Sequence, residues 1–183
     1  MQFNEKIKIT HGIDLIVRRK DGSIKDERHY GDIKDGVKRK IKDGFFTRLY
    51  KRLTKKCIMV DGITNAGKAA MAGLDLKDIS VNDFDWLAIG TGTTGFLATQ
   101  TTLVTETHRE AGTGTRVMTT VANDTAQLVA TFSGYSGTEA ITEIGKFNLV
   151  SGGDMQMRQT FAAFNMDWDQ GDNLGATVKV QYS

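Results

Sequence analysis

The sequence predicts a mainly β protein: an antiparallel β-sandwich or open barrel with one short helix, preceded by a β-hairpin and a basic amphipathic helical segment. Short runs rich in β-branched and aromatic residues recur through the C-terminal two thirds, separated by Gly, Asn and Asp. Several runs alternate apolar and polar residues, as Leu128, Ala130 and Phe132 do, which is the period of half-buried antiparallel strands. No strand-helix-strand alternation indicates a parallel sheet.

The first predicted element is a hairpin. Residues 13–19 and 23–30 are two short runs with β-branched residues, and Lys20-Asp21-Gly22 separates them. Asp-Gly between such runs is a strong hairpin signal. An isolated two-stranded ribbon is only marginally stable in water, so we expect the hairpin to dock on the rest of the chain or on a neighbouring molecule.

A basic amphipathic helix is predicted next, with a break near Gly44 because glycine weakens a helix interior. Apolar residues recur every fourth position from Ile33 to Leu53, and Lys and Arg fill many of the positions between them. This face is either a solvated helix surface or a docking surface for an acidic protein or nucleic acid. The candidate docking residues are Ile41, Phe45, Leu49 and Leu53 for apolar contact, and Lys38, Arg39, Lys40, Lys51 and Arg52 for electrostatic contact.

The remainder of the chain predicts one helix followed by strands. Asn65 is a good helix cap, and the small residues from Ala66 to Leu74 favour a short helix. The predicted strands are residues 84–89, 115–121, 127–132, 141–150, 155–161 and 177–182.

Length and charge predict two regions. The chain of 183 residues is long enough for one core of ordinary size. Residues 1–57 hold 17 Lys and Arg against 8 Asp and Glu, a charge of +9, whereas residues 58–183 hold 7 against 14, a charge of −7. We therefore divide the chain into a basic N-terminal arm, 1–57, and a β-sandwich domain, 58–183. Such asymmetry usually concerns binding partners.

Several function classes lack support in the sequence. No apolar run reaches the roughly 20 residues of a membrane helix, and the N-terminus has no apolar signal-peptide stretch. The single cysteine, Cys57, excludes an intrachain disulfide framework, and three scattered histidines do not suggest a metal site. We therefore expect no cofactor, no metal and no contact with a membrane.

Two motifs resemble ligand sites but fail on closer reading. The segment from Gly90 to Gly95 matches the glycine pattern of a dinucleotide fingerprint, yet the threonine-rich residues after it are a poor helix, and the fingerprint needs a helix there. The acidic segment Asp167 to Asn173 has its glycine and twelfth residue out of place for an EF-hand. We interpret the first as a strand-edge loop and the second as a solvated turn, with a calcium-binding turn as the alternative.

No catalytic constellation emerges either. His108 stands between polar neighbours that predict exposure, and no nucleophile elbow precedes a helix. The pair Glu139 and Glu143 does not indicate catalysis, because the sequence does not give the distance between the two carboxylates. We predict a protein without enzymatic activity and without catalytic residues.

The order of the motifs resembles a family of small virion structural proteins of tailed bacteriophages, found among tail-fibre, baseplate and decoration proteins. The resemblance covers most of residues 58–183 and, more loosely, residues 12–30. It rests on Ile63-Thr64-Asn65-Ala66-Gly67-Lys68-Ala69-Ala70-Met71-Ala72, Trp86-Leu87-Ala88-Ile89-Gly90-Thr91-Gly92-Thr93-Thr94, Glu143-Ile144-Gly145-Lys146-Phe147-Asn148 and Met157-Arg158-Gln159-Thr160-Phe161.

The resemblance implies a non-catalytic building block in the virion, assembled in the host cytoplasm and associated with the tail, baseplate or neck. Its partners would be other virion proteins and further copies of itself, repeated by particle symmetry. A capsid decoration (cement) protein is one alternative, and a module that binds nucleic acid through the basic helix is another. An enzyme or a sugar-binding lectin is the third alternative.

The opposite charges of arm and body suggest how copies could associate. The arm of one copy would lie against the acidic body of the next, or against another acidic neighbour. This hypothesis predicts that assembly weakens as the salt concentration rises.

Overall fold

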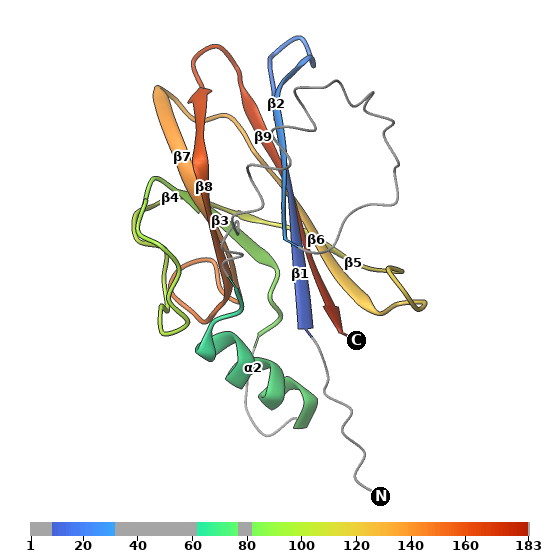
Figure 1. Cartoon of the computed structure of the whole chain (residues 1–183). Helices are drawn as coiled ribbons and strands as arrows, with labels where there is room; N and C mark the ends of the chain where they lie inside the picture. The colour runs from blue at the N-terminus through green and yellow to red at the C-terminus, as the bar shows by residue number, and fades with distance from the viewer. Residues whose placement is uncertain (1–8, 32–61, 77–81, 183) are drawn as a thin grey trace, which may run out of the picture.

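Two antiparallel sheets packed face to face form most of what the computed structural model describes, residues 9–31, 62–76 and 82–182 (Figure 1). The elements are β1 Ile9–Arg18, β2 Ile24–Gly31, α2 Asn65–Leu76, β3 Trp86–Gly90, β4 Glu106–Ala111, β5 Thr113–Val117, β6 Thr125–Phe132, β7 Thr138–Phe147, β8 Met155–Asp167 and β9 Asn173–Tyr182. The strand order is β2-β1-β9-β6-β5 in one sheet and β4-β3-β7-β8 in the other. The predicted sandwich with one short helix is confirmed.

The core lies between the two sheets because the strands alternate as the sequence predicts. In β9, Leu174, Ala176, Val178 and Val180 are each at most 1% exposed, and they face residues of the opposite sheet. The apolar residues of the other strands that join them are Ile13, Leu15, Val17, Leu87, Ile89, Leu128, Ala130, Phe132, Ile141, Ile144, Met157, Phe164 and Met166, with Trp168 just after β8.

The predicted hairpin forms, and its docking partner is the body of the protein itself. Gly22, at φ +83°, closes the turn with a hydrogen bond from its amide to the Arg19 carbonyl at 2.9 Å. Strand β1 then pairs with β9 over its whole length, from Ile9 opposite Tyr182 to Arg18 opposite Asn173. The hairpin is therefore part of the sandwich. The proposed boundary between residues 57 and 58 lies outside the described residues.

Strand β4 is the element that the sequence did not indicate. Its residues, Glu-Thr-His-Arg-Glu-Ala, show no apolar alternation because it is an edge strand whose central residues are polar and only half-buried. The chain then crosses from one sheet to the other at Gly112, whose amide donates to the Asp85 carbonyl at 2.7 Å. A Cβ at Gly112 would lie 2.6 Å from Leu128 Cδ1, so the crossing requires glycine.

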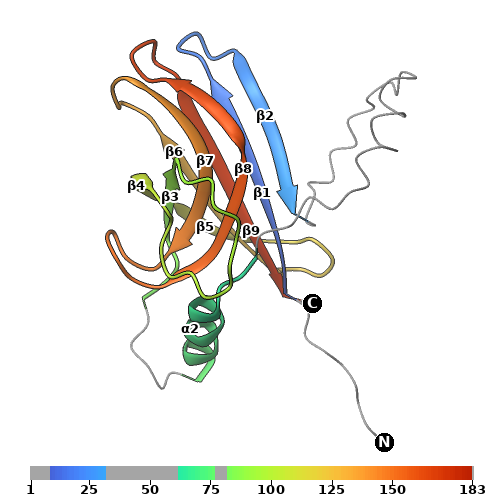
Figure 2. The same cartoon turned by 60° about the vertical axis from the view of Figure 1, so that its left-hand side comes forward.

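Helix α2 lies at one end of the sandwich, against the start of β8 and opposite the β1–β2 and β8–β9 turns (Figure 2). Its buried residues are Gly67, Ala70 and Gly73, which are small enough for the helix to come close to the sheet. No helix in the described ranges is long and apolar enough to cross a membrane.

Candidate functional site

The predicted docking residues cannot be placed in this fold. Ile41, Phe45, Leu49, Leu53, Lys38, Arg39, Lys40, Lys51 and Arg52 all lie within residues 32–61, outside the described residues, as does the predicted basic helix. The described residues contain the motifs of the body and the surfaces of its two sheets.

The body motifs meet around one buried ion pair, Glu143 of β7 and Arg158 of β8. Arg158 Nε donates to Glu143 Oε2 at 2.8 Å, and both side chains are fully buried. The Glu143 carboxylate also accepts the backbone amides of three residues in the loop between β3 and β4: Gly92 at 3.0 Å, Val104 at 3.1 Å and Thr105 at 2.8 Å. One carboxylate thus receives four donors, which compensates for its removal from water.

Arg158 holds the other part of the same loop. Its Nη2 donates to the Thr94 carbonyl at 2.9 Å, and its Nη1 donates to Gln100 Oε1 at 3.1 Å. The glycines of the loop fit this arrangement: a Cβ at Gly92 would collide with the Glu143 carboxylate and lie 2.6 Å from Val104 Cβ. No helix follows Gly95 in the structure, so the glycine pattern serves a close approach to a buried carboxylate.

The loop covers the outer face of the four-stranded sheet. Leu103 packs there with Ala88, Phe147 and Met155 in a second, smaller apolar cluster. At its rim the Arg109 guanidinium lies 3.8 Å from the centre of the Phe147 ring. Its Nη1 atom also donates to the Leu149 carbonyl at 2.7 Å. This charged side chain is therefore fixed by a cation-π contact and a hydrogen bond.

The helix motif joins the same assembly through Thr64. The Thr64 hydroxyl accepts the Gly67 amide at 2.9 Å, as an N-cap does, and donates to the Met155 carbonyl. The predicted cap at Asn65 is therefore wrong by one residue, since Asn65 is already the first helical residue. A Cβ at Gly67 would lie 2.6 Å from Gln156 Cα, so this glycine sets the distance between α2 and β8.

The carboxylates of the acidic turn between β8 and β9 are engaged by backbone amides and by a lysine of the first hairpin. Asp172 Oδ2 accepts the Asp167 amide at 2.9 Å and pairs with the Lys25 ammonium. Asp167 Oδ1 accepts the Gln170 amide at 3.2 Å, and Asp169 accepts the Gly137 amide at 2.9 Å. Burial would raise the pKa of Asp172, but its hydrogen bonds outweigh that effect, and the pKa lies below its ordinary value.

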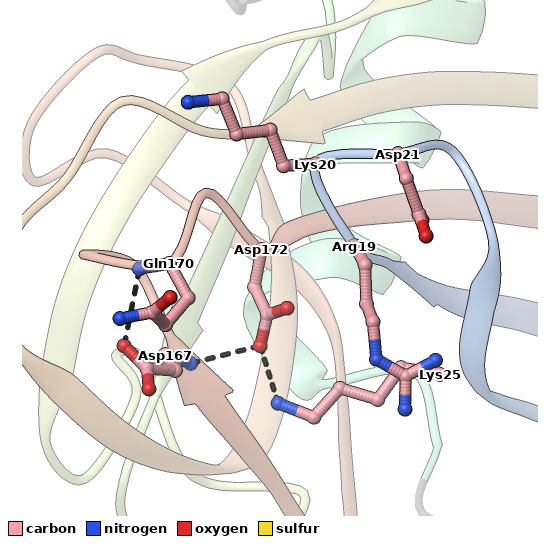
Figure 3. Close-up of a pocket in the computed structure, with 7 residues that line it drawn as sticks. All are labelled: Arg19, Lys20, Asp21, Lys25, Asp167, Gln170 and Asp172. Carbon is pink, nitrogen blue, oxygen red and sulfur yellow. Dashed lines mark hydrogen bonds and ion pairs between the residues drawn. The ribbon is translucent and has the colours of Figure 1, made fainter.

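An open depression of about 490 Å³ lies between this turn and the β1–β2 turn (Figure 3). Arg19, Lys20, Asp21, Lys25, Asp167, Gln170 and Asp172 line it. Its lining holds both basic side chains, from the hairpin, and acidic side chains, mostly from the β8–β9 turn, so it presents no field of one sign to a ligand. In the described part of the chain, no three His, Cys, Asp or Glu side chains are placed to hold a metal ion.

His108 differs from its predicted exposure, because it is half-buried in an aromatic cluster at the end of the sandwich. Its ring stacks on Tyr135 at 3.6 Å between centres and meets Trp168 edge-on. His108 Nε2 and Trp168 Nε1 both lie within hydrogen-bond distance of Glu139 Oε2, at 2.8 and 2.9 Å. Burial and then the hydrogen bond to Glu110 raise the pKa of Tyr135. The cluster joins β4, β7 and the loops around them.

Comparison with protein-family models, with curated proteins and with solved structures finds no match for this chain. The class that the fold and its sites define is a mainly β domain of two packed antiparallel sheets. Of its motif residues, Gly92, Glu143 and Arg158 are buried in one hydrogen-bond network, and Thr64 and Gly67 are buried where α2 meets β8.

Proposed function

We propose that the protein is a non-catalytic structural component of a tailed-bacteriophage virion, built into the tail, baseplate or neck through contacts with other virion proteins. The observation that carries the proposal is the position of the four motifs that resemble those of such proteins. Three of them supply the Glu143–Arg158 network, and the fourth supplies Thr64 and Gly67, which fasten α2 to β8.

This network supports a scaffolding role because of what its groups are engaged in. A catalytic carboxylate has to reach a substrate, whereas Glu143 is fully buried and receives four donors from the chain. The network instead fixes a fifteen-residue connection, residues 91–105, on the outer face of a sheet. A body with fixed loops loses little conformational freedom on contact with a partner, which favours assembly.

The proposal is tested on particles. Antibodies raised against the purified chain are used for immunogold electron microscopy of virions produced from the genome that encodes it, with virions lacking the gene as the control. Label on the tail, baseplate or neck is the expected result. Label on the head would support the decoration protein instead. Absence of the chain from purified particles, checked by mass spectrometry, would overturn a structural role.

The contribution of the basic arm is tested separately. Cross-links from lysines in residues 38–56 to acidic surfaces of neighbouring proteins are expected in intact particles, together with loss of assembly at high salt. Replacing Lys38, Arg39 and Lys40 with alanine should weaken assembly in the same way. If light scattering shows assembly that is indifferent to salt, the electrostatic contact of the arm is wrong, and the virion role stands on the immunogold result alone.

A further inference from the structure

The edges of the two sheets differ in how far they are protected from pairing with another strand. Unpaired edge strands invite association, and proteins block them with charged residues or with covering segments. The outer strand β2 carries four consecutive charged residues, Lys25 to Arg28, and β4 carries Glu106, Arg109 and Glu110. The charges of β2 and β4 therefore protect both edges from pairing with another strand.

The edge strand β8 is protected by other parts of the chain. At its start, the Thr64 amide donates to the Gln156 carbonyl at 3.0 Å, and Ile63 forms a bridge with Met157. Further along, the Arg28 guanidinium donates to the carbonyls of Ala162 and Ala163. The edge of β8 therefore has partners at its start and just past its middle.

Strand β5 is the exception among the described edge strands (Figure 1). Its sequence, Thr-Gly-Thr-Arg-Val, contains a single charge, and four of its five residues are exposed. β6 pairs with one side of it, and in the described ranges no strand pairs with the other. An exposed edge with β-branched residues and one charge has the composition of a pairing surface.

We propose that β5 pairs antiparallel with β5 of a second copy of this chain, about a two-fold axis at Thr115. This inference rests on the proposed function, because it names one of the contacts through which copies assemble. The pairing joins the two five-stranded sheets into one continuous sheet. It places Thr115 opposite Thr115 of the second copy, and Thr113 opposite Val117 of the second copy.

The second copy fits because the strand is complementary to itself in this register. The residues of one face, Thr113, Thr115 and Val117, are all β-branched, and such pairs stabilise antiparallel sheets. On the other face, each Arg116 lies opposite Gly114 of the second copy, so the two arginines do not face each other. A Cβ at Gly114 would have no heavy atom within 4 Å, which leaves room there for the arginine side chain.

The strand is also held in place before any partner arrives. Asp124 accepts the amides of Thr119, Thr120 and Val121 at 2.8 to 3.0 Å, which fixes the β5–β6 loop. Gln181 of β9 donates to the Thr120 hydroxyl at 2.9 Å. A preformed edge loses little conformational entropy on pairing, which favours association.

Charge variants at Gly114 test the register with the full chain. Gly114→Lys places a cation opposite Arg116 of the second copy, and sedimentation velocity should show the dimer dissociation constant rising at least about tenfold. Gly114→Glu places an anion there and should lower the constant. At concentrations low enough to leave all three proteins monomeric, neither variant should unfold in urea more readily than the wild type, because the space beside Gly114 is open. Equal dissociation constants for both variants would overturn the register.

A cysteine scan tests the axis independently, in a Cys57→Ser background. Thr115→Cys should form an interchain disulfide under mild oxidation, because the residue faces itself across the axis. Thr131→Cys is the matched control, an exposed threonine of β6 that is distant from the axis. A wild-type chain that is monomeric at every concentration, or a dimer that cross-links no better at position 115 than at 131, overturns the pairing. Neither result affects the immunogold test of the virion role.

Discussion

Lys146 shows how one buried charge can work against the fold. It is 5% exposed in β7, with Leu87 and Met157 opposite it on the neighbouring strands. Burial lowers the pKa of Lys146 to about 8, and the nearby charge of Asp85 only partly opposes this effect. Below pH 8 the folded protein therefore holds a poorly solvated ammonium group.

We predict that Lys146→Met stabilises the protein at pH 7 by about 1 to 3 kcal/mol. Between pH 8 and the ordinary lysine value of 10.5, the unfolded chain binds a proton that the folded chain has released. The free energy of unfolding of the wild type therefore rises with pH across that window, by up to about 3 kcal/mol at 1.36 kcal/mol per pKa unit.

Urea unfolding at pH 7, 8.5 and 10 measures this effect. The difference between wild type and Lys146→Met should shrink as the pH rises, since other titrating groups contribute equally to both proteins. A difference that does not change with pH would contradict the prediction.

The Glu143–Arg158 pair gives a second prediction at the residue scale. Arg158→Met leaves the Glu143 carboxylate buried with three amides and no counter-charge, and removes the bond to the Thr94 carbonyl. Breaking a buried pair from one side costs about 3 to 5 kcal/mol. Urea unfolding should show a loss of that size, whereas Lys68→Met, at an exposed lysine of α2, should change stability little. Equal effects of the two changes would contradict the structural importance of the pair.

At the scale of elements, the contact between α2 and β8 depends on glycine. Alanine favours a helix interior by about 1 kcal/mol over glycine, so helix propensity alone predicts that Gly67→Ala stabilises the protein. The structure predicts the opposite, because the new Cβ would lie 2.6 Å from Gln156 Cα. We expect a loss of about 1 to 3 kcal/mol from the forced separation.

Thermal unfolding of Gly67→Ala and Gly95→Ala provides the comparison. The loop glycine Gly95 has open space around a Cβ, so its substitution should leave the melting temperature nearly unchanged. A higher melting temperature for Gly67→Ala would show that the helix does not pack against β8 as described.

Some elements were predictable and others were not, for identifiable reasons. The turn at Asp21-Gly22 and the alternation in β6 and β9 are local signals, and the structure confirms them. The sequence does not indicate β4, because an edge strand of half-buried polar residues has no apolar period. The sequence favours Asn65 as the helix cap, but the Thr64 hydroxyl is the group that reaches the Gly67 amide.

For the whole molecule, the position of β1 decides whether the first hairpin can be removed. β1 lies between β2 and β9 and supplies Ile13, Leu15 and Val17 to the core. Burial of each such side chain contributes about 1.5 to 3 kcal/mol, and their sum approaches the whole stability of a typical domain. A chain that starts at residue 58 should therefore fail to fold.

The amide NMR spectrum of residues 58–183 measures this. Collapsed, poorly dispersed signals are expected, with the full chain as the control for a dispersed spectrum. A well-dispersed spectrum of the fragment would show that the body folds without the arm, and that the two are separate units. Although the hairpin lies outside residues 58–183 in the sequence, the folding of those residues depends on it.

The sequence by itself determined the class of the fold, because strand periods, turn residues and helix formers act over a few neighbouring positions. It also raised the correct doubt about the Gly90 to Gly95 motif, since a threonine-rich sequel disfavours the helix that a fingerprint needs. Tertiary structure alone decided that Glu143 and Arg158 meet, that β1 lies inside a sheet and that β5 is an edge strand with no described strand on its outer side. These features depend on which distant segments become neighbours, and pairing across the chain leaves no periodic trace in any one segment.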